Sequence, residues 1–151
     1  KLLKLFFASF LIIISSCSLL EKKIQKSNVF ISMKRTPCYG TCPQYQVTIF
    51  SNGLIKYEGK RFVDKIGCFR SKLSRKKIEN IVSLVNKINY FKLDSVYSSN
   101  VTDLPSVVTE VIVNGKSHRV VDEKLSETKL NILYEKIDKL IIEVDEWKMC
   151  H

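Results

Sequence analysis

The sequence predicts an α+β domain of two layers, in which two helices cover one face of an antiparallel sheet. Apolar and polar residues alternate across 29–72, as in strands that bury one side. Across 74–91 and 126–144 the apolar residues recur every three or four positions, as on one face of a helix. The predicted order is β-β-β-β-α-β-β-α, with the apolar faces of both helices packed on the sheet.

Six strands are expected from the alternating segments. Asn52-Gly53 and Asn114-Gly115 join two pairs of them as tight hairpins, because these residues tolerate positive φ angles. Gly67 is a candidate bulge in the fourth strand. The first four strands then form an antiparallel meander. The expected strands lie at 29–35, 46–50, 54–59, within 62–72, at 107–113 and at 117–121.

Both helices are predicted to begin at a serine. Ser74 caps the first helix, which runs to Phe91, and Leu73 before it supplies a hydrophobic staple. In the second helix Ser126 is the expected cap, and an apolar stripe follows as far as Val144.

The first twenty residues, KLLKLFFASFLIIISSCSLL, are typical of an export signal. Lys1 and Lys4 form a charged head, residues 5–14 form an apolar core, and small residues precede Cys17. A membrane span needs about 20 apolar residues, and this run is shorter. We therefore interpret 1–16 as a signal peptide.

The four residues Ile14 to Cys17 resemble the lipobox of bacterial lipoproteins. The resemblance implies that Cys17 is the lipid attachment site, where several acyl chains such as palmitate form a stable membrane anchor. Residues 17–28 would then be the lipidated cysteine with a polar tether, and 29–149 the folded domain. The protein would reside in the bacterial cell envelope, and the outer membrane is favoured over the inner one. Both the periplasmic and the surface face of that membrane are possible locations. An ordinary cleaved signal and an uncleaved anchor are the alternatives.

The chain is basic, with 25 Lys and Arg against 15 Asp and Glu and a formal charge of +10. Lysine greatly outnumbers arginine, which is the better residue for planar recognition of phosphate. We expect no nucleic-acid partner. Solvated faces account for most of the excess charge, and attraction of Lys22, Lys23 and Lys26 to anionic headgroups is the alternative.

The stretch TPCYGTCPQY, with Cys38 and Cys42 four residues apart, allows three interpretations. A redox centre is disfavoured because the flanking prolines exclude the helix N-terminus that lowers a thiol pKa. A metal site is disfavoured because His118 and His151 are not paired with the cysteines at ligand spacing. A disulfide that stabilises the loop is favoured, since exported thiols meet an oxidising compartment.

The segment RTPCYGTCPQYQVTIFSNGLIKYEGKRFV, followed by TDLPSVVTEV, resembles an uncharacterised bacterial envelope domain, domain of unknown function 6438. The likeness covers about 31–141. It implies a small, often lipidated or secreted domain and no known activity. Cys68 and Cys150 lie outside its signature. They are either bonded to each other or buried as small apolar side chains, and three pairings of the four cysteines are formally open.

Three segments are expected to form one binding surface. They carry Arg35, Tyr39, Tyr45, Tyr57 and Asp103, and tyrosine and arginine are residue types that anchor interfaces. A loop made rigid by a disulfide also loses less entropy on binding. The alternative is structural: Asp103 forms a turn and the tyrosines lie flat on the sheet.

Motifs of catalysis are missing from the sequence, which has no G-x-S-x-G, no H-E-x-x-H and no phosphate-binding loop. We expect no catalytic residue, no metal and no cofactor. The favoured function is a lipid-anchored, non-catalytic module that binds a protein or cell-wall partner near the membrane. The rival functions are an envelope enzyme that acts through the cysteine loop and a structural component of the envelope.

Overall fold

The computed structural model describes residues 29–150 except 102–103 and 126–127. The predicted signal peptide and tether therefore lie outside the described residues. Within the described part, no helix has the length and apolar character needed to span a membrane. The elements are β1 (Val29–Arg35), β2 (Gln44–Phe50), β3 (Leu54–Arg61), β4 (Gly67–Lys72), α2 (Arg75–Lys87), η2 (Tyr90–Lys92), β5 (Val96–Tyr97), β6 (Val107–Val113), β7 (Lys116–Asp122), α3 (Asn131–Ile142) and β8 (Lys148–Met149).

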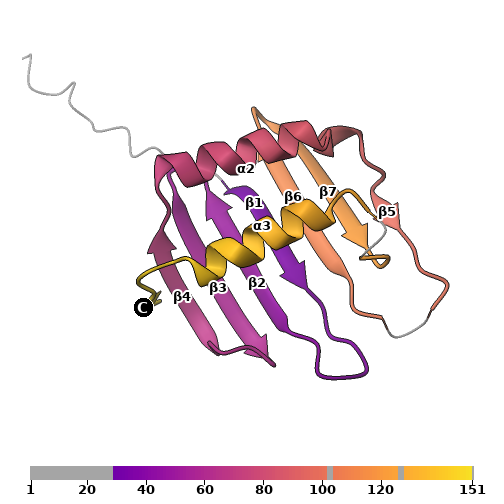
Figure 1. Cartoon of the computed structure of the whole chain (residues 1–151), viewed down its shortest axis with the longest axis horizontal. Helices are drawn as coiled ribbons and strands as arrows, with labels where there is room; N and C mark the ends of the chain where they lie inside the picture. Colours follow the sequence, from indigo (N-terminus) through magenta and orange to yellow (C-terminus); the bar gives the residue numbers. More distant parts are fainter. Residues whose placement is uncertain (1–28, 102–103, 126–127, 151) are drawn as a thin grey trace, which may run out of the picture.

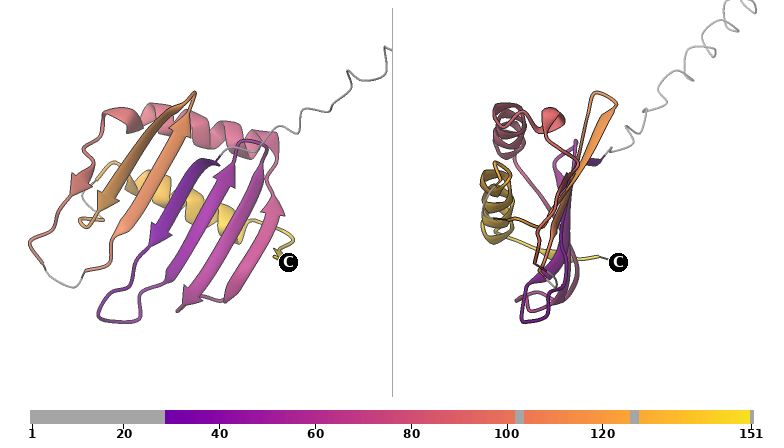
Figure 2. Two further views of the ribbon diagram at one scale, coloured as in Figure 1. Left: turned by 180° about the vertical axis from the view of Figure 1, so that it is seen from behind. Right: turned by 90° about the vertical axis from the view of Figure 1, so that its right-hand side faces the viewer.

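The predicted α+β fold is confirmed, with one sheet and two helices that lie on the same face of it (Figures 1 and 2). The strand order is β5-β7-β6-β1-β2-β3-β4-β8, so the first four strands form the expected meander. The β6–β7 hairpin pairs with the other side of β1. The short strands β5 and β8 were not predicted, and β5 is parallel to β7. No helix of the described residues covers the opposite face of the sheet (Figure 2).

The two Asn-Gly pairs form the predicted hairpin turns. Gly53 has φ 85°, Asn114 has φ 51° and Gly115 has φ 77°, all in the left-handed region where Asn and Gly are tolerated. The bulge expected at Gly67 is absent. Gly67 is instead the first residue of β4, directly opposite Gly59, and its φ of 108° lets the chain turn into the strand.

The core lies between the helices and one face of the sheet. Alternation along the strands buries every second side chain, and the helices contribute the residues of their apolar stripes. All of the buried hydrophobic residues that the structure describes lie between residues 30 and 140, so the fragment 29–151 contains this whole core and is expected to fold by itself. The sheet and the helices supply, among others, Met33, Val47, Ile49, Ile55, Val111, Ile81, Leu133, Ile137 and Leu140.

The first helix begins where it was predicted and ends earlier. The Ser74 side chain accepts a hydrogen bond from the backbone N–H of Lys77, which is the predicted cap. The helix ends at Lys87, because Asn89 adopts a left-handed conformation with φ 53°. A turn of 3-10 helix follows and buries Tyr90.

The second helix begins at Asn131, so the prediction of a start at Ser126 was wrong. Ser126 itself lies outside the described residues. Leu130 occupies the cap position without a side-chain hydrogen bond. The chain before the helix is organised instead by the fully buried carboxylate of Asp122, which accepts hydrogen bonds from the backbone N–H groups of Lys124 and Leu125, two and three residues further on.

The hydroxyl groups of Thr128 and Tyr134 also donate hydrogen bonds to the Asp122 carboxylate, at 2.6 Å and 3.0 Å. Four donors compensate for the loss of hydration of a buried charge. The connection between β7 and α3 is therefore organised around Asp122 rather than around a serine.

A second disulfide joins the C-terminal segment to the sheet. Cys68 of β4 is bonded to Cys150, across a separation of 82 residues. This agrees with one of the two alternatives left open for these cysteines. Beside the bond, β8 pairs with β4 through Phe69 and Arg70.

The two disulfides are expected to differ in their contribution to stability. The chain-entropy model assigns about 4.5 kcal/mol to a loop of 82 residues and about 2 kcal/mol to a loop of four. The double variant Cys68→Ser/Cys150→Ser should therefore lower the free energy of unfolding more than Cys38→Ser/Cys42→Ser does. Urea unfolding of both variants and the parent measures this. A larger loss in the Cys38/Cys42 variant would contradict the prediction.

Candidate functional site

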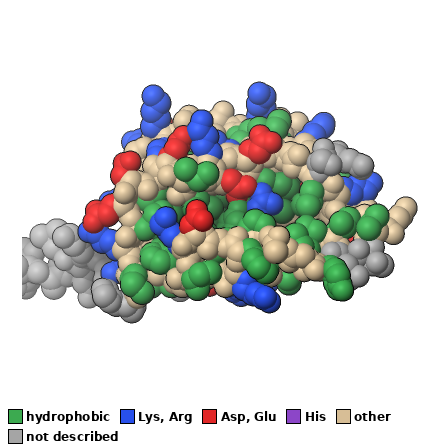
Figure 3. All heavy atoms as spheres, turned by 60° about the horizontal axis from the view of Figure 1, so that its bottom comes forward, with side chains coloured by type: hydrophobic (Ala, Val, Ile, Leu, Met, Phe, Trp, Pro, Cys, Tyr) green, Lys and Arg blue, Asp and Glu red, His purple; other side chains and the backbone are tan. Residues whose placement is uncertain are grey.

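Three loops lie at the same end of the strands, which we call the loop edge. They are residues 36–43 between β1 and β2, residues 62–66 between β3 and β4, and the described parts, 98–101 and 104–106, of the connection between β5 and β6 (Figure 1). Hydrophobic side chains gather along this edge, with charged ones between them (Figure 3). Tyr39, Phe62, Ile66, Val101 and Leu104 are the large exposed hydrophobic residues of these loops.

The 36–43 loop is held at both its tip and its base. Cys38 and Cys42 are bonded to each other, with their Cα atoms 5.8 Å apart. At the base, the N–H of Thr36 donates to the carbonyl oxygen of Ser106 at 3.0 Å, and the N–H of Ser106 donates to the Thr36 hydroxyl at 2.8 Å. The cysteine loop and the end of the 98–106 loop are therefore fixed side by side.

A cluster of three polar side chains lies behind these loops, where the sheet meets α3. Arg35 and Tyr45 are opposite each other on β1 and β2. The Arg35 Nε donates to the Tyr45 hydroxyl at 2.9 Å, and its Nη2 donates to the Asp138 carboxylate of α3 at 2.6 Å. The Tyr45 hydroxyl also donates to Asp138. The cluster thus joins two strands to one helix.

The sequence analysis missed Asp138, although its position carried a signal. It lies four residues after Tyr134 and three before Ile141, both of which face the core or its margin. A carboxylate on the inward stripe of a helix needs a partner in the sheet. The sequence offered no means of choosing Arg35, which is 103 residues away.

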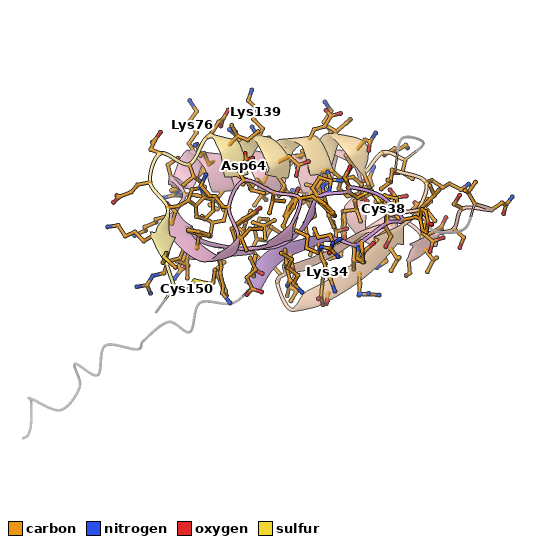
Figure 4. The ribbon with its side chains drawn as sticks, turned by 90° about the horizontal axis from the view of Figure 1, so that it is seen from below. Lys34, Cys38, Asp64, Lys76, Lys139 and Cys150 are labelled. Atoms are coloured by element: carbon orange, nitrogen blue, oxygen red, sulfur yellow. A yellow bond between two sulfur atoms is a disulfide. The ribbon has the colours of Figure 1, made fainter. Side chains whose placement is uncertain are left out.

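A cleft of about 630 Å³ opens beside this cluster, between α3, β2 and β3 and the 62–66 loop. Its inner wall is a row of aromatic rings, with the Tyr45 and Tyr57 centroids 5.5 Å apart and those of Tyr57 and Trp147 5.8 Å apart. Asp64 lies on the helix side of the sheet, near α3 (Figure 4). The lining residues are Arg35, Pro43, Tyr45, Tyr57, Phe62, Val63, Asp64, Lys65, Asp138, Ile141, Ile142, Val144 and Trp147.

Two features position the walls of the cleft. The 62–66 loop folds back on β3, where a Cβ atom on Gly59 would be only 1.8 Å from the carbonyl oxygen of Lys65. This contact requires glycine at position 59. On the other side, Trp147 is followed directly by β8 and by the disulfide of Cys150, which attach its segment to β4.

A larger hollow of about 720 Å³ lies between the edge of β4 and the end of α3. Four of its charged residues form ion pairs: Lys77 pairs with Glu143 at 3.8 Å and Lys148 with Glu146 at 3.6 Å. It has no aromatic wall. The cleft beside Arg35 is therefore the better candidate for recognition of a partner.

The polar groups of Arg35, Tyr45 and Asp138 satisfy one another at the back of the cleft. Burial raises the pKa of Tyr45, and its hydrogen bond to Asp138 and the charge of that carboxylate raise it further. The phenol is therefore neutral at physiological pH, and Asp138 is occupied by Arg35 and Tyr45. Among the described residues, no group of three His, Cys, Asp or Glu side chains is placed to hold a metal ion.

Arg35, Tyr45 and Tyr57, three of the five predicted surface residues, lie together in the cleft. Tyr45 and Tyr57 are nearly buried, so they form its wall. Tyr39 is 94% exposed on the loop edge and outside the cleft. Asp103 and Cys17 lie outside the described residues.

Comparison with known families gives one result. A family model described as a domain of unknown function, DUF6438, matches residues 29–141, from the first residue of β1 into α3. No curated protein matches the chain.

Buried tyrosines predict a loss of stability at alkaline pH. Burial raises the pKa of Tyr45 and Tyr134 above the ordinary 10.0, and raises that of Tyr90 to about 12. Above pH 10 the unfolded chain releases phenolic protons that the folded chain keeps, so the free energy of unfolding should fall as the pH rises. Tyr45→Phe should make this fall shallower by about 1.4 kcal/mol per pH unit.

Urea unfolding at a series of alkaline pH values measures the slope. Tyr39→Phe is the matched control, because its ring lies in solvent and contributes no burial. Equal slopes for the two variants would contradict the assignment of Tyr45.

Proposed function

Because the chain belongs to the DUF6438 family of domains of unknown function, we propose its function from its own geometry. It is a bacterial cell-envelope lipoprotein, anchored through Cys17, whose folded domain binds a protein partner at the loop edge and the adjoining cleft. The domain acts as a recognition module and not as a catalyst.

The observation that carries this proposal is the apolar character of the loop edge. Ten large hydrophobic side chains are exposed among the described residues, and five of them lie on the three loops of this edge. Single exposed hydrophobic residues are ordinary, whereas their gathering on one surface marks an interaction site. Tyr39, Phe62 and the aromatic wall of the cleft are the residue types that dominate the energy of protein interfaces.

The loop edge is also preorganised. The Cys38–Cys42 bond, the Thr36–Ser106 hydrogen bonds and the Arg35–Asp138 ion pair restrict the loops before a partner arrives. A surface that is already ordered loses less conformational entropy on association. This is the favourable case for a binding module.

The path of β1 supports access by a partner. The strand starts at Val29, where the proposed tether ends, and reaches the loop edge at Arg35. Seven residues of extended chain span roughly 23 Å. A partner at the loop edge would therefore not collide with the tether.

A second candidate function is thiol-disulfide exchange through the cysteine loop. One observation favours it: the backbone N–H of Gly40 donates to the Cys38 sulfur at 3.2 Å. Such a donor would stabilise a thiolate at Cys38 after reduction. Loss of exchange activity in a folded Cys38→Ser/Cys42→Ser variant would favour this function over the binding module.

Photo-cross-linking in cells tests the binding surface. The full chain carries a photoreactive amino acid at Tyr39 or Phe62, both exposed on the loop edge, or at Lys116 in the β6–β7 hairpin at the opposite edge. We expect one discrete adduct from Tyr39 and Phe62 and none from Lys116. The adduct should decrease when Ile66 and Leu104 are changed to serine.

Thermal unfolding of each variant shows whether it keeps the fold. Equal cross-linking from Lys116, or no adduct from the loop positions in a folded protein, would rule out the loop edge as the binding surface.

Membrane attachment is expected to depend on Cys17. In cell fractionation the parent should stay in the membrane fraction after a high-salt wash, because two or more acyl chains bind stably. Cys17→Ala should abolish acylation, as read by mass spectrometry, and prevent lipoprotein processing. A parent chain that is processed without a lipid would contradict the proposed anchor.

A further inference from the structure

The face of the sheet opposite the helices has an excess of basic side chains. Alternation places the buried residues of each strand toward the helices, so their neighbours point to the other side. Lys34 lies on that side, whereas Lys76 and Lys139 extend from the helix side (Figure 4). The strand register places on this open face the basic residues Lys34, Lys56, Arg70, Lys72, Arg119 and Lys148 and the acidic residues Glu58 and Glu110.

Three of the cations form one row across neighbouring strands. Lys56 of β3 is opposite Arg70 of β4, and Arg70 is opposite Lys148 of β8. Like charges at opposite positions of a sheet destabilise it. Glu58 neutralises Lys56 at 2.5 Å, and Glu146 lies 3.6 Å from Lys148.

The remaining cations of the face form no ion pair within the described part of the chain, although Glu110 is opposite Arg119 in the strand register. Lys34, Arg70, Lys72 and Arg119 form no ion pair with a described residue. All four are exposed. The open face therefore presents a positive charge that an external anion can compensate.

The shape of the face favours an extended planar anion over a small one. The basic residues extend from Arg119 on β7 to Lys148 on β8, across seven strands, which is roughly 30 Å at the usual strand spacing. Between the cations the middle of the face presents the polar residues Ser32, Gln46 and Thr48 and one acidic residue, Glu110, and none of these four is aromatic. Single-stranded nucleic acid is bound by stacking on aromatic side chains, which the middle of this face lacks.

We propose that the open face binds the surface of a bilayer that contains anionic phospholipids. Lys34, Arg70 and Lys148 contact the headgroups, and the helices face away from the membrane. The cleft and the loop edge then remain accessible to a partner. This proposal depends on the proposed function in one respect: the anchor at Cys17 is what brings the domain to a membrane.

Vesicle flotation tests this proposal separately from the anchor. The fragment 29–151 contains the described core and both disulfides but neither Cys17 nor the apolar N-terminal segment. It should bind vesicles made of equal parts phosphatidylglycerol and phosphatidylcholine at low salt, and not vesicles of phosphatidylcholine alone. Salt should release it, because screening weakens contacts between exposed charges.

Two variants with the same net charge identify the face. Lys34→Gln/Arg70→Gln/Lys148→Gln should lower the partition coefficient by about two orders of magnitude, since each basic residue near an anionic surface contributes about a factor of five. Lys76→Gln/Lys87→Gln/Lys139→Gln, on the helices, should change it by no more than about twofold, because screening over a Debye length of about 10 Å weakens distant charges.

Equal losses in the two variants would overturn the proposal, because the binding would then depend on net charge alone. Equal binding to both kinds of vesicle would overturn it as well. Binding to a single-stranded oligonucleotide, lost in the Lys34 variant, together with no binding to vesicles would assign the face to nucleic acid instead. Thermal unfolding confirms that each variant is folded.

Discussion

The buried carboxylate of Asp122 determines where α3 crosses the sheet. Asp122 ends β7 and accepts hydrogen bonds from the chain that leads into the helix and from Tyr134 in its first turn. These bonds connect the last residue of β7 to the beginning of α3. The position of the helix then brings Asp138 to Arg35 and carries the chain onward to Trp147, which completes the aromatic wall of the cleft.

The cleft and the loop edge are held in place by hydrogen bonds, an ion pair and a disulfide at one end of the strands. Arg35 is the last residue of β1 and is held by both β2 and α3. The loop that follows it is closed by a disulfide and bonded to Ser106. Hydrophobic side chains that would cost free energy in solvent are therefore displayed on a surface that the rest of the domain keeps rigid.

Much of the fold was predictable because its longer elements have a strong period. VFISMKR alternates from Ile31 to Lys34, VVTEVIV consists almost entirely of β-branched residues, and both strands have the predicted bounds. The two-residue strands β5 and β8 are too short to show any period. The start of α3 was mispredicted because the chain before the helix is organised around the buried carboxylate of Asp122, whose bonds to Thr128 and Tyr134 no capping pattern in the sequence reveals.

The candidate site was likewise predictable only where its residues are close in the sequence. Arg35 and Tyr45 were predicted together because they flank one short loop. Their partner Asp138 comes from the last helix, and no local pattern links it to them.

The Cys68–Cys150 bond makes most of the domain a covalent ring. The ring begins in β4 and includes α2, β5, β6, β7, α3 and β8, with the 98–106 loop inside it. A protease that cuts this loop once would open the ring without separating the two pieces. The nicked protein would gain only the mass of one water, its two pieces would stay joined by the disulfide, and they would separate only after reduction.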